Sequence, residues 1–111
     1  MNDINVQILN NNTENSQDHL NLLRKIRDKP KSSQRELAEE LGFSLGKLNY
    51  ILKSLKIKGL IKTRNFEKNR KKLNYIYLLT PKGIAEKTKL TMNFMKRKMQ
   101  EYDELKKDLK K

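Results

Sequence analysis

The chain has 111 residues and no cysteine, and its 26 lysines and arginines against 13 acidic residues give a net charge of +13. This length suffices for one domain, and the lack of cysteine excludes disulfides, thiolate zinc sites and thiol redox switches. The charge favours polyanionic partners such as nucleic acid or an anionic membrane surface. No apolar run could span a bilayer, and the start of the chain lacks the features of a secretory signal. We therefore expect a cytoplasmic protein.

The excess of positive charge lies in the second half of the chain. Residues 1–52 contain seven basic and seven acidic residues, whereas residues 53–72 contain nine basic residues and one acidic residue. Residues 73–111 contain ten basic and five acidic residues. This asymmetry indicates a directed basic face rather than a general device for solubility.

The N-terminal part predicts an arm followed by a helix. Residues 1–15 contain six asparagines and little apolar periodicity, so we predict a mobile arm there. A leucine-rich stretch then predicts a helix that is capped by Ser16 or Asp18 and ends before Pro30.

Two short helices should follow. Ser33 and Glu36 have the spacing of a capping box, and Gly42 would end the helix that they begin. Ser44 would cap the next helix, over residues 44–58. Its apolar positions form one stripe: Leu48, Ile51, Leu52 and Leu55. A short glycine-containing turn between two helices is typical of the helix-turn-helix motif.

After Gly59 the apolar period changes from about 3.6 to 2, which predicts strands. Residues 60–65 and 73–79 would form an antiparallel hairpin joined by the charged connection 66–72. The order of elements over residues 16–80 is that of a winged helix-turn-helix domain.

Thr80 and Pro81 have the types expected at the N-cap and first position of a last helix, over residues 81–111. We therefore predict a mainly α fold with a small β-hairpin, in which a winged helix-turn-helix is followed by a long C-terminal helix. Residues near Ile84 should pack on the domain.

The predicted helix 44–58 is the candidate recognition helix. Removing its apolar stripe leaves six candidate DNA-binding residues: Ser44, Gly46, Lys47, Asn49, Tyr50 and Lys53. Lysine and asparagine are residue types that hydrogen-bond to guanine and adenine edges, respectively, so we expect Lys47 and Asn49 to contact bases. Tyr50 and Lys53 would contact sugar and phosphate. Gly46 would permit close approach. The alternative is that all six are ordinary solvated residues.

The predicted wing, residues 66–72, has four cations as candidate backbone contacts: Lys68, Arg70, Lys71 and Lys72. Beside DNA, each cation can release a counterion from a phosphate. The alternative is a solvated charge run that protects a strand edge from aggregation.

Three short segments, SLGKLNY, KGLI and LLTPKG, resemble the winged-helix core of the MarR superfamily, and the small branch associated with exopolysaccharide (EPS) in particular. The resemblance covers roughly residues 17–110. It implies a homodimeric bacterial transcriptional regulator that binds two-fold symmetric double-stranded DNA through its third helix. Larger members frame a ligand pocket with long terminal helices, and the short, Asn-rich N-terminal part here makes a small-molecule effector doubtful.

The last helix carries a candidate dimerisation stripe. Six apolar side chains recur along it: Met92, Met95, Met99, Tyr102, Leu105 and Leu109. Lys98 and Lys106 interrupt a coiled-coil register and favour an offset or antiparallel crossing. The alternative is an amphipathic helix that folds back on its own domain. A membrane-surface role is disfavoured by the scattered acidic residues.

No enzyme, cofactor or metal site is predicted. His19 is the only histidine, and the adjacent Glu39 and Glu40 point in different directions on a helix. Neither a phosphate-binding loop nor a metal-ligand spacing occurs. Two other classes stay open, a winged-helix protein–protein adaptor and an RNA-binding factor in transcription elongation.

Overall fold

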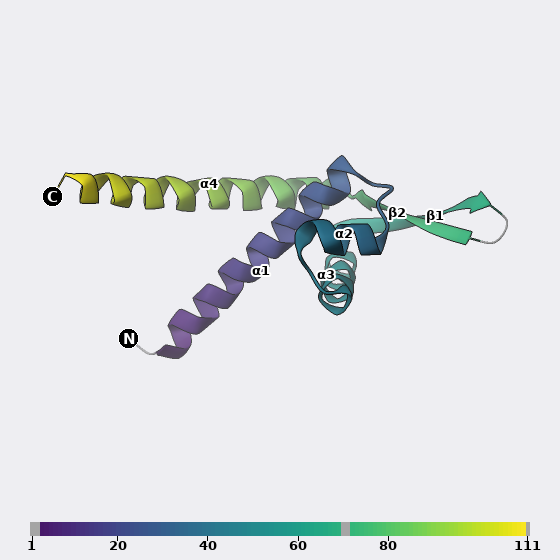
Figure 1. The fold of residues 1–111 in the computed structure, drawn as a ribbon, viewed down its shortest axis with the longest axis horizontal. Coiled ribbons are helices and arrows are strands. Elements are labelled where there is room, and N and C mark those ends of the chain that lie inside the picture. Colours follow the sequence, from purple (N-terminus) through teal and green to yellow (C-terminus); the bar gives the residue numbers. More distant parts are fainter. Residues whose placement is uncertain (1–2, 70–71, 111) are drawn as a thin grey trace.

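The structure is a computed structural model that describes residues 3–69 and 72–110. Three helices precede a two-stranded antiparallel hairpin, and a long helix follows it (Figure 1). The elements are α1 (Asp3–Asp28), α2 (Gln34–Leu41), α3 (Leu45–Ile57), β1 (Ile61–Asn69), β2 (Lys72–Leu79) and α4 (Pro81–Leu109). This confirms the predicted mainly α fold with a small β-hairpin and a long C-terminal helix.

The core lies between the first three helices and the base of the hairpin. It contains the predicted stripe of α3, together with buried residues of α1, α2, both strands and the position just before β1: Leu22, Leu23, Ile26, Leu37, Ala38, Leu60, Ile61 and Tyr77. The apolar side chains recur every three or four residues in each helix, so each helix has one face to bury. Burial of these faces is the main stabilisation of the domain.

Three hydroxyl side chains cap helices as the sequence predicts. Each accepts a backbone N–H bond from the first turn: Ser33 from Glu36 at 3.1 Å, Ser44 from Lys47 at 3.1 Å and Thr80 from Gly83 at 3.0 Å. Two glycines adopt the left-handed conformation that ends the preceding helix, Gly42 with φ 70° and Gly59 with φ 73°.

The N-terminal segment differs from the prediction. Residues 3–15, expected to be a mobile arm, are the first part of α1, which continues without a break to Asp28. The physical reason is that the chain contains neither glycine nor proline before Pro30. Asparagine lowers helix propensity only modestly, so a helix nucleated by the leucine-rich part can extend toward the N-terminus.

The hairpin is also longer than predicted. β1 continues to Asn69 and β2 begins at Lys72, so most of the expected connection 66–72 belongs to strands. The register pairs Ile61 with Leu79 and Asn69 with Lys72, with an irregularity after Glu67. A two-stranded ribbon can carry charged residues on its faces because solvent hydrates them, so the charge run did not have to end the strands.

Helix α4 extends well beyond the domain (Figure 1). The radius of gyration is 17.4 Å, whereas a compact chain of this length would have about 13 Å. Ile84, expected to pack on the domain with its neighbours, lines a hollow with Ile26 and Leu79 but remains 55% exposed. Gly83, Leu90 and Phe94 lie on the covered side of α4, so Ile84 lies at the start of the exposed apolar stripe.

The start of α4 is fixed to the start of β1. The Thr80 hydroxyl donates to the carbonyl oxygen of Gly59 at 2.6 Å, and the Thr80 N–H donates to that of Leu60 at 3.0 Å. The backbone of Gly83 lies directly against Leu60, where a Cβ atom would overlap the Leu60 carbonyl oxygen. This close approach explains the glycine in the first turn of α4.

Candidate nucleic-acid interface

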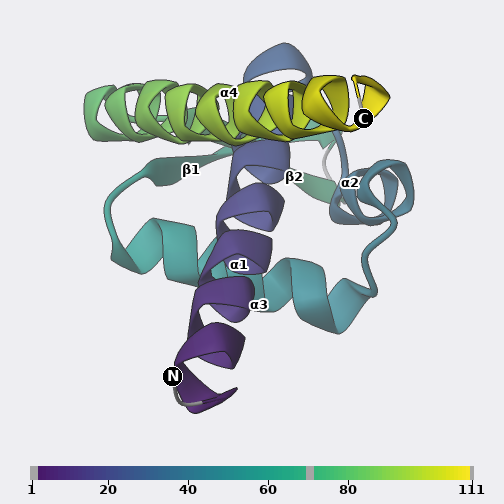
Figure 2. The same cartoon turned by 90° about the vertical axis from the view of Figure 1, so that its left-hand side faces the viewer.

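Helix α3 lies on the side of the molecule opposite α4, and the hairpin projects from the same domain (Figure 1 and Figure 2). Leu48, Ile51, Leu52 and Leu55 attach α3 to the core. The opposite side of the helix is free of the rest of the domain, because Tyr50 is 75% exposed and Ile57 is 78% exposed. An α-helix presented in this way has the diameter that a major groove admits.

The six candidate residues of α3 have different surroundings. Ser44 is the N-cap, so its hydroxyl is occupied by the backbone of α3. Gly46 is exposed, and a Cβ atom there would meet nothing within 4 Å. Tyr50 occupies the middle of the free side. Lys47 and Asn49 lie on the two flanks of the helix, and Lys53, seven residues after Gly46, lies on the free side next to Asn49.

Lys47 is held by other parts of the domain. Its ammonium nitrogen lies 3.0 Å from the Asp18 carboxylate of α1 and 4.5 Å from the centre of the Phe43 ring. The Asp18 side chain is only 18% exposed, so the carboxylate needs this partner. A contact of Lys47 with a base would require the ion pair to break.

The Asp18–Lys47 pair should therefore contribute to stability. In a double-mutant cycle of Asp18→Asn and Lys47→Met, we expect a coupling free energy of about 1 kcal/mol from urea unfolding. The matched control is Lys98→Met with Glu101→Gln, a pair whose side chains are 58% and 60% exposed, where we expect about 0.3 kcal/mol. Equal coupling in both cycles would show that Asp18 does not depend on Lys47.

A groove of about 360 Å³ lies between α3, the start of α2 and the base of the hairpin. Asn49, Lys53 and Lys56 line it from α3. On the other wall, the Gln34 amide donates to the Tyr77 hydroxyl at 2.8 Å. Lys56 was missed by the sequence interpretation, although its spacing of three from Lys53 and seven from Asn49 places all three on one flank.

The wing candidates lie at the far end of the hairpin. Lys68 belongs to β1 and Lys72 to β2, and Arg70 and Lys71 fall outside the described residues. The backbone thus carries Lys68 and Lys72 away from the domain on the ribbon that flanks α3 (Figure 1).

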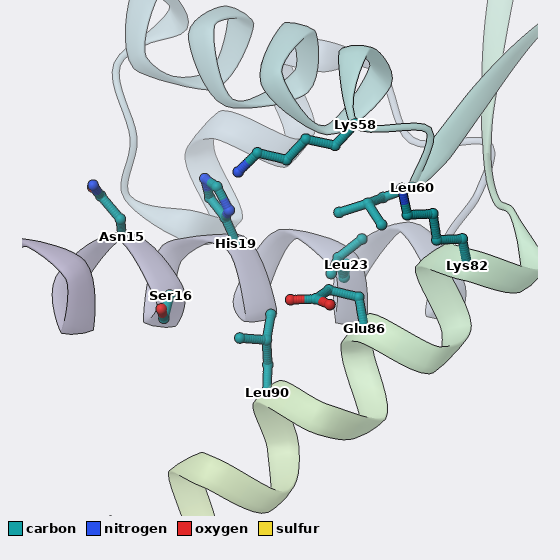
Figure 3. Close-up of a pocket in the computed structure, with 9 residues that line it drawn as sticks. All are labelled: Asn15, Ser16, His19, Leu23, Lys58, Leu60, Lys82, Glu86 and Leu90. Carbon is teal, nitrogen blue, oxygen red and sulfur yellow. The ribbon is translucent and has the colours of Figure 1, made fainter.

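A hollow of about 410 Å³ lies where α1 and α4 meet, near the end of α3 (Figure 3). His19 and Leu23 of α1 line it, with Lys58 and with Glu86 and Leu90 of α4. Burial, and then the neighbouring charge of Lys58, lower the pKa of His19, against opposing effects of Asp18 and Glu86. The imidazole is therefore neutral at pH 7.

The helices α1 and α2 are joined by a second charged cluster. The Glu40 carboxylate accepts a hydrogen bond from Lys29 at 3.1 Å and lies 3.2 Å from Lys25. These two lysines lower the pKa of Glu40, Lys29 most strongly. The cluster links α2 to the end of α1. None of its three residues lines the groove beside α3.

Residues 19–62 match the family model described as winged helix-turn-helix, DNA-binding. A sequence search of curated proteins found no match. The solved structures that share the fold include a MarR-family transcription regulator with a TM-score of 0.63 and 18% identity, over 93% of this chain and 81% of that one. The fold is a winged helix-turn-helix.

Other solved structures have similar TM-scores. Lactococcus lactis ZitR in complex with DNA has a TM-score of 0.56 and 22% identity, over 82% of this chain and 58% of that one. Streptomyces coelicolor PcaV, a transcriptional regulator in complex with its natural ligand, has a TM-score of 0.62 and 17% identity, over 70% of this chain. The present chain spans 54% of the length of PcaV.

No helix in residues 3–69 and 72–110 is long and apolar enough to cross a membrane. In this part of the chain, no three histidine or acidic side chains come together as they would to bind a metal ion.

Proposed function

We propose that this protein is a sequence-specific transcriptional regulator that binds double-stranded DNA with α3 in the major groove and the hairpin on the backbone. The exposed side of α3, beside the groove lined by Asn49, Lys53 and Lys56, is the observation that carries the proposal. A helix-turn-helix docks its second helix in this way.

The distribution of charge also supports α3 and the hairpin as the DNA-binding surface. Nine basic residues and one acidic residue lie between residues 53 and 72, in the segment that runs from α3 through the hairpin. Phosphates attract such a surface without regard to sequence. The fold shared with the DNA complex of ZitR supports duplex DNA over an acidic protein partner.

A homodimer is part of the proposal. Met95, Met99 and Tyr102 of α4 are 56%, 64% and 64% exposed on one side of the helix. A second copy of α4 would bury them and would place two α3 helices at the half-sites of a symmetric site.

The assignment to a particular family of regulators rests on sequence resemblance. SLGKLNY, KGLI and LLTPKG support a bacterial, cytoplasmic regulator of the MarR superfamily in its EPS-associated branch, acting on exopolysaccharide genes. The same resemblance assigns the protein no enzymatic activity.

A gel-shift comparison tests the function. Duplex DNA should bind more tightly than single-stranded DNA or RNA of the same sequence, and selection from a random duplex pool should yield one preferred site. Tighter binding to RNA would support the elongation-factor alternative, and no binding to any nucleic acid would support the adaptor.

The wing should contribute by neutralising phosphates. Changing Lys68, Arg70, Lys71 and Lys72 to alanine should weaken binding to all duplexes alike and reduce the salt slope by ~0.9 for each phosphate that is no longer neutralised. The matched control removes four exposed charges of α4 and its C-cap: Lys89, Lys96, Lys107 and Lys110. A slope that falls equally in both variants would indicate a general charge effect instead of a specific role of the wing.

A further inference from the structure

The first turns of α3 lack an available cation at the centre of the free side. Lys47 is paired with Asp18 on the flank that faces α1. Lys53 lies two turns after Gly46, where it lines the groove with Asn49. Lysine contacts with guanine edges need an ammonium group aimed into the groove, so the first two turns of α3 offer Tyr50, rather than a cation, on the free side.

Gly46 and Tyr50 occupy that centre. Gly46 precedes Tyr50 by four residues, so the two positions share one face of α3. Position 46 has no side chain and has open space around it. Tyr50 itself is 75% exposed. Tyrosine is one of the residue types that are enriched in binding interfaces.

The major groove offers one apolar group at its base edges, the C5 methyl group of thymine. We propose that the exposed ring of Tyr50, on the face that Gly46 leaves open, recognises a thymine methyl group, so that Tyr50 is a specificity-determining residue. This inference rests on the proposed function and replaces the assignment of Tyr50 to the phosphate backbone. The positive charge of the surrounding surface supplies the attraction that brings the ring to duplex DNA.

Replacement of thymine by uracil removes only the methyl group and tests the inference. In the duplex selected from a random pool, single uracil substitutions should identify one position per half-site at which binding weakens roughly fourfold, the effect of exposing one buried methyl group. Tyr50→Phe should keep this sensitivity, because the ring makes the contact. Tyr50→Ala should bind the thymine and uracil duplexes equally.

Two results would overturn the inference while leaving the proposed function intact. One is a selected site without a required thymine. The other is a weaker affinity of Tyr50→Phe for every duplex with no response to uracil, which would assign the hydroxyl to a phosphate. Failure to bind any duplex would instead remove the proposed function itself.

Discussion

Replacing Gly83 with alanine should lower the free energy of unfolding by about 3 kcal/mol, although alanine is ordinarily the better helix residue. The new Cβ would overlap the carbonyl oxygen of Leu60 and lie 2.9 Å from its carbonyl carbon. Both are backbone atoms, so no side-chain rotation can make room. The Thr80 N–H donates to the same oxygen, so the first turn of α4 would have to lift away from β1.

Urea unfolding followed by circular dichroism measures this effect. The matched control is Gly46→Ala in the first turn of α3, where a Cβ has nothing within 4 Å. That change should raise stability by up to ~1 kcal/mol. Equal midpoints for Gly83→Ala and the unaltered protein would mean that α4 does not depend on this close approach.

Changing Met99 and Tyr102 together to aspartate should convert the proposed dimer into a folded monomer. Each residue is 64% exposed in the single chain, so its contribution to the domain itself is small. At an interface between two chains, the two carboxylates would be buried without partners, which opposes association. Binding to the symmetric site should fall by at least ~100-fold, since the second half-site no longer adds its effective concentration.

Analytical ultracentrifugation at micromolar concentration should show a dimer for the unaltered protein and a monomer for this variant. Asn93→Asp with Gln100→Asp is the matched control, since both residues are exposed and lie on α4 outside the apolar stripe. That variant should remain dimeric. A monomer in the unaltered protein that still binds one half-site tightly would contradict the dimer.

Local periodicity was sufficient for the elements that form the core. The stripe Leu48, Ile51, Leu52 and Leu55 is buried as its spacing predicts, because burial of one helix face depends only on the helical repeat. The helix caps at Ser33, Ser44 and Thr80 were predictable for a similar reason. Each cap satisfies N–H groups within its own first turn.

Contacts between distant segments were not predictable in this way. The helical repeat marks Lys47 as outside the core, yet its partner Asp18 belongs to another helix, and only the crossing of α1 over α3 brings them together. In the sequence, Gly83 appears only as a residue of low helix propensity. Its role, which is to allow close approach to the backbone of Leu60, depends on a contact between distant segments. The extension of α1 to Asp3 was not predicted, because the high asparagine content of residues 1–15 indicates an irregular segment. The absence of glycine and proline before Pro30 nevertheless permits a helix there.

Every side chain from Lys98 to Lys110 is exposed in the single chain, so tertiary packing adds nothing to the backbone hydrogen bonds of this last part of α4. An isolated helix of that length is marginal in water. Its amide hydrogens should therefore exchange rapidly in dilute protein and become protected as concentration rises. In the proposed dimer, order in this segment and self-association form one linked equilibrium, in which protein abundance sets the helix content.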